Sequence, residues 1–242
     1  YELCMYDFSR DMFAGTGIGE VNAIIRSLHK PGVWVNLSQT PHVMRLTQRN
    51  MKVRVEEDIN IGGVTGLVED KDGNLWISKW TDINVKRPDK DDLVVSGSDV
   101  PVMTSLFNDV KGEILGLSHE SKIYRLSCAD GRITCELKDS ISSLLEKEEV
   151  NSVCIDRKGR LWLNTTLGRI LRSDETMHKF ENVSLDNEID DCTVLGLLSD
   201  KNSVWIITNK KVLQYNIDSQ TFQHYSTVDD NIMVDVFRYK AI

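Results

Sequence analysis

Short runs of apolar residues alternate with polar turns along most of the chain, and this pattern predicts strands rather than helices. The apolar run Val64–Glu69 is followed by an Asp- and Gly-rich turn and then by a second apolar run, Leu75–Ser78. Such a turn predicts a β-hairpin, because Gly tolerates positive φ and Asp hydrogen-bonds to its own backbone. Runs of β-branched and aromatic residues predict strands elsewhere. Only Ser140–Glu149 has a helical pattern, which we expect to be an insertion between strands.

The turn and the second strand of this hairpin recur along the chain. Asp70–Ile77 reads Asp-Lys-Asp-Gly-Asn-Leu-Trp-Ile, and Asp156–Leu163 reads Asp-Arg-Lys-Gly-Arg-Leu-Trp-Leu. A third copy, Asp200–Ile206, is one residue shorter and lacks the Gly, and a weaker copy, Pro31–Val35, lacks the Asp. Repeats with a period of about 20–50 residues indicate a repeated structural unit.

The tryptophans of these copies give the period. Trp34 lies 42 residues before Trp76, and Trp162 lies 43 residues before Trp205. The 86 residues from Trp76 to Trp162 amount to two periods, and a hidden copy between them has Leu115 in place of the Trp. A period in the low forties corresponds to four short strands and their turns, the size of one β-propeller blade.

The two ends of the chain break this period. Leu3–Phe13 aligns with Leu195–Trp205 without a gap, so we expect Phe13 at a repeat position. However, Phe13 lies only 21 residues before Trp34, which is half a period. Either one blade is shortened or about half a blade is missing. Residues 231–242 begin like another strand and then stop.

We therefore predict an all-β fold in which about six four-stranded blade repeats form a single β-propeller domain, or a fragment of a larger propeller, over residues 1–242. The residue at the repeated position is expected to pack between neighbouring blades, since a repeat cannot bury its apolar face alone. The six repeat cores are Phe13, Trp34, Trp76, Leu115, Trp162 and Trp205.

Trp80 differs from the repeated tryptophans. It follows the repeated strand, and no other copy has an aromatic residue at that place. It is a better candidate than the repeated tryptophans for a surface aromatic that binds a ligand, although packing inside a loop is the interpretation that we favour.

Charge and composition exclude some partners. The 242 residues carry a formal net charge of −8, and their basic pairs form no stripe interleaved with aromatic residues. A nucleic-acid partner would require a basic face, so we expect none. No apolar run approaches the ~20 residues of a membrane span, so membrane attachment is expected only through a segment outside this chain. Because the chain does not begin with Met, we expect it to be a piece of a longer protein.

Cys128 and Cys135 flank the turn Ala129–Arg132. If that turn centres on Gly131 and Arg132, the two thiols face each other across a hairpin, and a disulfide is possible in an oxidising compartment. The five cysteines and five histidines lack the spacing of metal ligands. We expect no metal site and no cofactor.

The motifs that could carry chemistry are better explained by structure. Asp70–Asn74 begins like a calcium loop but lacks its closing Glu, and a hairpin turn accounts for it. The adjacent acids at 190–191 and 229–230 would point in opposite directions on an extended strand, whereas acid–base catalysis requires carboxylates that converge. The chain has no Gly-x-Ser-x-Gly and no His-Glu-x-x-His motif. The sequence therefore gives no positive indication of an enzyme.

The repeat resembles that of the two-component regulator propeller family. The resemblance rests on the string Asp-x-x-Gly-x-Leu-Trp-Ile, found best at Asp70–Ile77 and Asp156–Leu163. A short turn and an apolar strand with Arg or Tyr follow, as in Arg169–Arg172 and Val212–Tyr215. In this family the repeat builds the periplasmic sensor region of hybrid two-component sensor histidine kinases of Bacteroides-type bacteria.

This resemblance implies a non-catalytic sensor that responds to glycans or their breakdown products. Members carry two seven-bladed propellers, a β-sandwich, one membrane helix, and kinase and DNA-binding modules. The implied properties are a periplasmic location, an oligosaccharide ligand, a homodimer in the full-length protein and a histidine kinase in the parent chain.

Two other functions remain open. A propeller lyase acting on a polysaccharide or a cyclic peptide would need a histidine, such as His119 or His178, to converge with acidic residues. A protein-interaction scaffold of the WD40 kind is disfavoured by the absence of Gly-His and Trp-Asp dipeptides.

Overall fold

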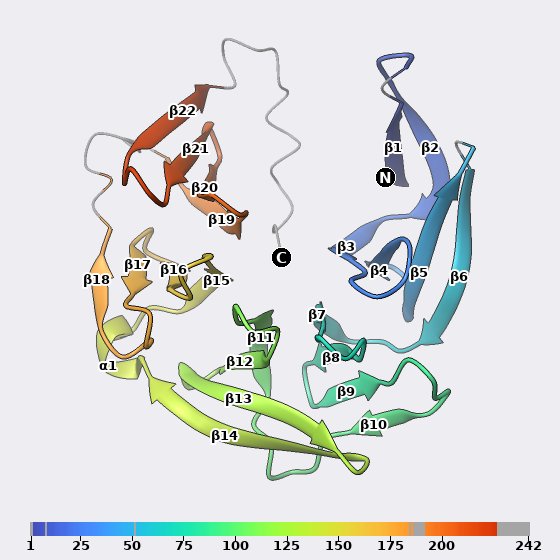
Figure 1. The fold of residues 1–242 in the computed structure, drawn as a ribbon, viewed down its shortest axis with the longest axis horizontal. Helices are drawn as coiled ribbons and strands as arrows, with labels where there is room; N and C mark the ends of the chain where they lie inside the picture. Colours follow the sequence, from blue (N-terminus) through green and yellow to red (C-terminus); the bar gives the residue numbers. More distant parts are fainter. Residues whose placement is uncertain (1, 8, 51, 184, 186–191, 227–242) are drawn as a thin grey trace. The chain divides into compact units, whose positions relative to one another are not determined.

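The computed structural model describes residues 2–7, 9–50, 52–183, 185 and 192–226 (Figure 1). These residues form strands β1 to β22 and one short helix, α1. The chain divides into two compact units, Tyr1–Leu106 with Cys128–Thr134 and Phe107–Ser127 with Cys135–Ile242. Among the described residues, no helix is long and apolar enough to cross a membrane.

The strands form one two-stranded sheet and five four-stranded sheets, each built from consecutive strands. The first sheet contains β1 (Glu2–Asp7) and β2 (Met12–Gly19). The second contains β3 (Val21–Arg26), β4 (Val33–Leu37), β5 (His42–Arg49) and β6 (Lys52–Asn60). The third contains β7 (Val64–Glu69), β8 (Leu75–Lys79), β9 (Ile83–Lys86) and β10 (Leu93–Val95).

The remaining three sheets follow the same plan. The fourth contains β11 (Met103–Asn108), β12 (Ile114–Ser118), β13 (Lys122–Ala129) and β14 (Arg132–Ser140). The fifth contains β15 (Val150–Ile155), β16 (Leu161–Thr165), β17 (Ile170–Ser173) and β18 (Phe180–Asn182). The sixth contains β19 (Val194–Ser199), β20 (Ser203–Thr208), β21 (Lys211–Asn216) and β22 (Phe222–Ser226).

Four consecutive antiparallel strands are the unit of a β-propeller blade, so the predicted all-β propeller fold is confirmed. Five of the six expected repeats are complete four-stranded blades in the described residues. Helix α1 (Ser142–Leu145) lies inside the segment expected to be helical, between β14 and β15. The acids at 190–191 and 229–230 and the partial strand at 231–242 lie outside the described residues.

The prediction that Phe13 is a repeat core is wrong. The fourth strands β6, β10, β14 and β18 each precede the first strand of the next sheet, and β2 precedes β3 in the same way, with Glu20 alone between them. Strands β1 and β2 therefore occupy the third and fourth positions of a blade, and Phe13 lies at the start of a fourth strand. It is 71% exposed. The sequence match failed because an apolar hairpin looks alike in either half of a blade.

The half-period break has the same explanation. The two-stranded sheet β1–β2 supplies the outer half of a blade, and a complete blade begins directly after it at Val21.

The other repeat cores lie on second strands. Trp34, Trp76, Leu115 and Trp162 are all at most 4% exposed. Trp34 clusters with Leu67 and Ile77 of the following sheet, and Trp162 clusters with residues of β19 to β21. The expected packing between neighbouring blades is thus seen at these positions. Trp205 is half-buried, with its ring centre 5.7 Å from that of Tyr225.

The repeated Asp explains why the turn and the Trp recur together. Asp70 Oδ1 accepts the backbone N–H groups of Asp72 and Asn74, both at 2.9 Å, and Oδ2 accepts the indole N–H of Trp76 at 2.7 Å. One carboxylate therefore shapes the turn and fixes the buried ring. The Gly of the phrase, Gly73, has a φ of 81°, a conformation that favours glycine.

The divergent copies show which part of this arrangement each has lost. Asp109 still accepts two backbone N–H groups, but Leu115 offers no indole. In the shorter third copy, Asp200 Oδ2 still accepts the Trp205 indole N–H at 2.8 Å. In the weaker copy near the start of the chain, the position six residues before Trp34 is Leu28 instead of Asp. The buried indole nitrogen of Trp34 has no hydrogen-bond partner among the described residues.

Candidate functional site

Trp80 lies in the turn between β8 and β9, in the first compact unit. Its side chain is 69% exposed, so Trp80 is a surface aromatic and is not packed inside the loop, which is the interpretation that the sequence favoured. The turn is closed by a hydrogen bond from the Lys79 N–H to the Asp82 carbonyl at 2.9 Å. The Trp80 N–H donates to the Gly63 carbonyl at 3.3 Å. This bond ties the Trp80 turn to the connection between β6 and β7.

Trp80 borders a cleft of about 400 Å³. The cleft is formed where the β4–β5 turn, the β6–β7 connection and the Trp80 turn lie together at one end of two neighbouring sheets. It is lined by Asn22, Asn36, Leu37, Ser38, Gln39, Thr40, Pro41, Gly62, Gly63, Val64 and Trp80. We call it the Trp80 cleft.

The lining combines one large aromatic surface with amide and hydroxyl groups. Asn36 lies at the end of β4 and is buried, whereas Gln39 and Thr40 are exposed in the turn that follows. The Ser38 hydroxyl oxygen is buried without a hydrogen-bond partner among the described residues, while its N–H donates to the Glu20 carbonyl at 2.9 Å. An amide or hydroxyl can both donate and accept hydrogen bonds. The cleft is therefore suited to an uncharged ligand that bears several hydroxyl groups.

Two adjacent glycines let Trp80 lie close to the β6–β7 connection. Gly63 has a φ of +72°, and a Cβ atom there would lie 3.7 Å from Trp80 Cδ1. A Cβ atom on Gly62 would lie 3.2 Å from Pro41 Cβ, which is tighter than an ordinary contact. Larger residues would strain this connection and crowd the cleft wall.

The Asp82 side chain stabilises the Trp80 turn through hydrogen bonds to neighbouring residues. Its carboxylate accepts hydrogen bonds from the Thr81 hydroxyl at 2.5 Å and from Lys79 Nζ at 3.4 Å, and also from the Asn84 amide. Burial alone raises the pKa of Asp82, but the hydrogen bonds from Thr81, Asn84 and Lys79 outweigh it and keep the pKa below its ordinary value. Asp82 therefore stays negatively charged at neutral pH.

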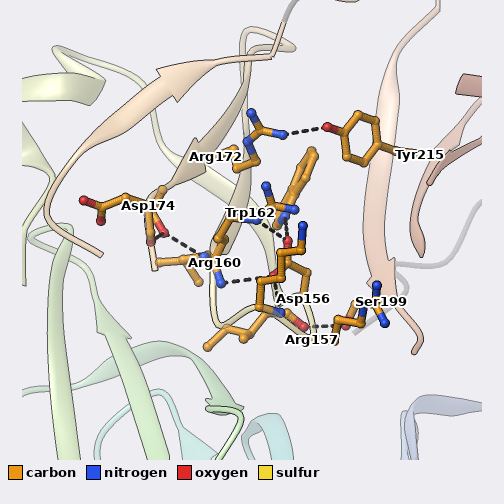
Figure 2. A network of polar contacts seen from close by, with 12 residues as sticks. Asp156, Arg157, Arg160, Trp162, Arg172, Asp174, Ser199 and Tyr215 are labelled. Atoms are coloured by element: carbon orange, nitrogen blue, oxygen red, sulfur yellow. Dashed lines mark hydrogen bonds and ion pairs between the residues drawn. The ribbon is translucent and has the colours of Figure 1, made fainter. Parts of the chain in front are cut away.

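A second polar cluster lies in the other unit and supports the fold (Figure 2). The buried Asp156 carboxylate accepts Arg160 Nε at 2.7 Å and Trp162 Nε1 at 2.9 Å. Arg172 lies over the Trp162 ring, 5.4 Å from its centre, and donates to the Tyr215 hydroxyl at 2.7 Å. The cluster joins β16 and β17 to β21 of the next sheet, which is a structural role.

Cys128 and Cys135 are not joined by a disulfide. The turn between β13 and β14 consists of Asp130 and Gly131, both with positive φ, so the hairpin centres one residue earlier than the sequence analysis assumed. This register puts Cys128 opposite Ile133 instead of Cys135. Burial raises the pKa of the Cys128 thiol above its ordinary value.

The histidines do not converge on a common site. His178, which follows β17, pairs through Nδ1 with Asp139 at 2.8 Å, and His42 pairs through Nδ1 with Asp58 at 2.8 Å. In the part of the chain that the structure describes, no three His, Cys, Asp or Glu residues are grouped as a metal site would require.

Residues 58–78 match the family model described as two component regulator propeller. The matched segment contains β7, the repeated turn and Trp76, so the resemblance recognised from the sequence is confirmed. No curated protein sequence matches the chain.

Several solved structures resemble the chain at low sequence identity. A streptogramin B lyase is 14% identical with a TM-score of 0.68, over 92% of this chain and 75% of that chain. An inactive variant of virginiamycin B lyase from Staphylococcus aureus, with quinupristin, is 11% identical with a TM-score of 0.61, over 89% of this chain and 74% of that one.

The extracellular domain of a putative hybrid two component system from B. thetaiotaomicron is 16% identical with a TM-score of 0.60. The match covers 88% of this chain but only 29% of that domain. At such identities these likenesses establish the fold alone.

Proposed function

We propose that this chain, which carries the two-component regulator propeller repeat, is a non-catalytic ligand-recognition propeller of a hybrid two-component signalling protein. The repeat at residues 58–78 is the observation that carries the proposal. The fold shared with an extracellular domain of such a system supports it. We place the chain in the extracytoplasmic, periplasmic part of an inner-membrane protein that dimerises and carries a histidine kinase elsewhere.

The Trp80 cleft supports oligosaccharide recognition. A sugar ring presents an apolar C–H face that can stack on an exposed indole, and its hydroxyls can bond to amides and hydroxyls such as those of Asn22, Gln39 and Thr40. The volume of about 400 Å³ is within the usual range for small-molecule sites. The ligand class we propose is therefore a glycan or a glycan breakdown product.

The same cleft argues against catalysis within it. Acid–base catalysis requires a titratable side chain within hydrogen-bond reach of the reacting group. No Asp, Glu, His, Lys, Cys or Tyr is among the described residues that line the Trp80 cleft. Recognition without turnover is the function that this lining supports.

A propeller lyase is the second candidate, because the fold of a streptogramin B lyase is similar with a TM-score of 0.68. One of the two histidines considered for a lyase, His178, pairs with Asp139. This pair joins the β17–β18 connection to β14, the fourth strand of the preceding sheet. Incubation of the chain with streptogramin B antibiotics and with polysaccharides, followed by mass spectrometry, tests this candidate. Product formation that is lost in His178→Ala would favour the lyase.

Calorimetric titration with a panel of oligosaccharides tests the leading proposal. We expect at least one oligosaccharide to bind the full chain and Trp80→Ala to abolish or weaken that binding. Phe13→Ala is the matched control, because Phe13 is another exposed aromatic of the same unit, outside the cleft. Absence of binding by every oligosaccharide in the panel would overturn the proposal.

A further inference from the structure

The lining of the Trp80 cleft is uncharged, although the chain as a whole is rich in charged residues. Asp, Glu, Lys and Arg make up 27% of the sequence, but none of them is among the eleven described residues that line the cleft. Its polar groups are the amides of Asn22, Asn36 and Gln39 and the hydroxyls of Ser38 and Thr40.

The basic groups that flank the lining are already paired with acids. Lys79, next to Trp80, forms an ion pair with Asp82 at 3.4 Å. His42, next to Pro41, pairs with Asp58 at 2.8 Å. Both side chains therefore already have an acidic partner, and neither is among the described residues that line the cleft.

Glu20 adds a negative charge near the cleft. The Gln39 amide nitrogen lies 3.5 Å from a carboxylate oxygen of Glu20. Asp82 is also an acid near the cleft, but its ion pair with Lys79 balances its charge. A carboxylate or sulfate in the cleft would lose hydration and meet like charges instead of a cation, which is unfavourable.

We propose that the Trp80 cleft selects uncharged oligosaccharide segments and rejects those that carry uronic acid or sulfate groups. This inference rests on the proposed function and specifies its ligand class. Trp80 supplies the stacking surface, and the amides and hydroxyls bond to sugar hydroxyls. The absence of a basic side chain in the lining supplies the selectivity.

A matched ligand pair tests the charge selectivity directly. Oligomers of β-1,4-linked mannose and of β-1,4-linked mannuronic acid differ only at C6, and a wider panel adds other neutral, uronic and sulfated oligosaccharides of equal length. We expect every ligand whose binding depends on Trp80 to be uncharged. The charged member of a pair should bind about tenfold or more weakly, because its charge finds no partner. Binding of the neutral ligand should be unchanged from about 0.05 to about 0.5 M salt.

The variant Gln39→Lys isolates the role of charge. Gln39 is exposed at the cleft, and its amide nitrogen lies 3.5 Å from Glu20, so the substitution is made together with Glu20→Gln to leave the new cation without an acidic partner there. We expect this pair of substitutions to raise the affinity for a uronic acid oligomer. Lys at an exposed position of the other unit, Leu167→Lys, is the control and should have no effect.

The outcomes separate this inference from the proposed function. Binding of a uronic or sulfated oligosaccharide that equals neutral binding and is lost in Trp80→Ala would overturn the charge selectivity and leave glycan recognition standing. Oligosaccharide binding that is unaffected by Trp80→Ala would overturn the assignment of this cleft. No binding by any oligosaccharide would overturn both.

Discussion

The carboxylate of Asp70 accepts a hydrogen bond from the indole nitrogen of Trp76, six residues further along the chain, at 2.7 Å. The same bond joins Asp156 to Trp162 at 2.9 Å. A hairpin turn and a buried ring between two sheets are thereby fixed by one side chain. The repeated phrase is thus a structural unit, and its divergent copies provide natural comparisons for its energetics.

The first prediction concerns the buried carboxylate. Asp156 is 1% exposed and pairs with Arg160, while Asp109 occupies the same place in a copy that has no indole. We expect Asp156→Ala to lower the free energy of unfolding by about 3–5 kcal/mol, because it leaves Arg160 without its partner. Asp109→Ala should cost about 1 kcal/mol, as loss of a turn cap does. Chemical denaturation measures both, and equal losses would contradict the stabilising role assigned to the buried Asp156 carboxylate and its partners.

A second prediction compares two tryptophans. Trp76→Phe removes a donor from Asp70 and should cost about 1–3 kcal/mol more than the loss of ring volume alone. Trp34→Phe removes an indole nitrogen that has no protein partner among the described residues, so it should cost only the loss of volume. Thermal unfolding of the two variants measures the difference. A Trp34→Phe variant as destabilised as Trp76→Phe would show that Trp34 Nε1 is satisfied in solution.

A third prediction concerns the Trp80 cleft wall. Gly63 has a φ of +72°, in the region that favours glycine. We expect Gly63→Ala to lower the free energy of unfolding by about 1 kcal/mol or slightly more. The added methyl group should also weaken ligand binding, because it lies beside Trp80 Cδ1. Gly131→Ala, at a φ of +74° with no atom near its Cβ position, is the control. It should lose stability and keep its ligand affinity.

A fourth prediction concerns acid stability. The hydrogen bond from Trp205, followed by backbone bonds, holds the pKa of Asp200 below its ordinary value. A carboxyl with a lowered folded pKa stabilises the fold above its unfolded pKa of about 3.9, and this contribution disappears as the pH falls through the folded pKa. Trp205→Phe should therefore raise the pKa of Asp200 and make stability less sensitive to acid below about pH 4. A carbon-13 NMR titration of the Asp200 carboxyl would refute this if the pKa were unchanged.

Periodicity in the sequence was sufficient to predict the blades. The spacing of Trp34, Trp76, Trp162 and Trp205 located the second strand of four sheets, and Leu115 in the same place located that of a fifth. Burial followed, since a side chain between two sheets has no access to water. Phe13 was misassigned because periodicity of two cannot distinguish the inner hairpin of a blade from the outer one.

The Trp80 cleft was less accessible to sequence reasoning. Trp80 was recognised because it breaks the repeat, but the cleft also requires the segments 36–41 and 62–64, which carry no motif. Their proximity arises from the packing of neighbouring sheets, and no local pattern encodes it. The hairpin at Asp130–Gly131 was predictable, because Asp-Gly is a preferred pair in two-residue turns with positive φ.

Fluorescence quenching tests the central claim, that Trp80 is a ligand surface, most directly. Trp80 is 69% exposed, whereas Trp34, Trp76 and Trp162 are at most 4% exposed. Trp205 is half-buried, so the measurement is made in a Trp205→Phe background, in which acrylamide should quench Trp80 preferentially. We predict that a neutral oligosaccharide shields this fluorescence at saturation, and that Trp80→Ala loses both the quenchable component and the shielding. Ligand binding that leaves Trp80 as accessible to acrylamide as before, or no shielding by any neutral oligosaccharide, would contradict the claim.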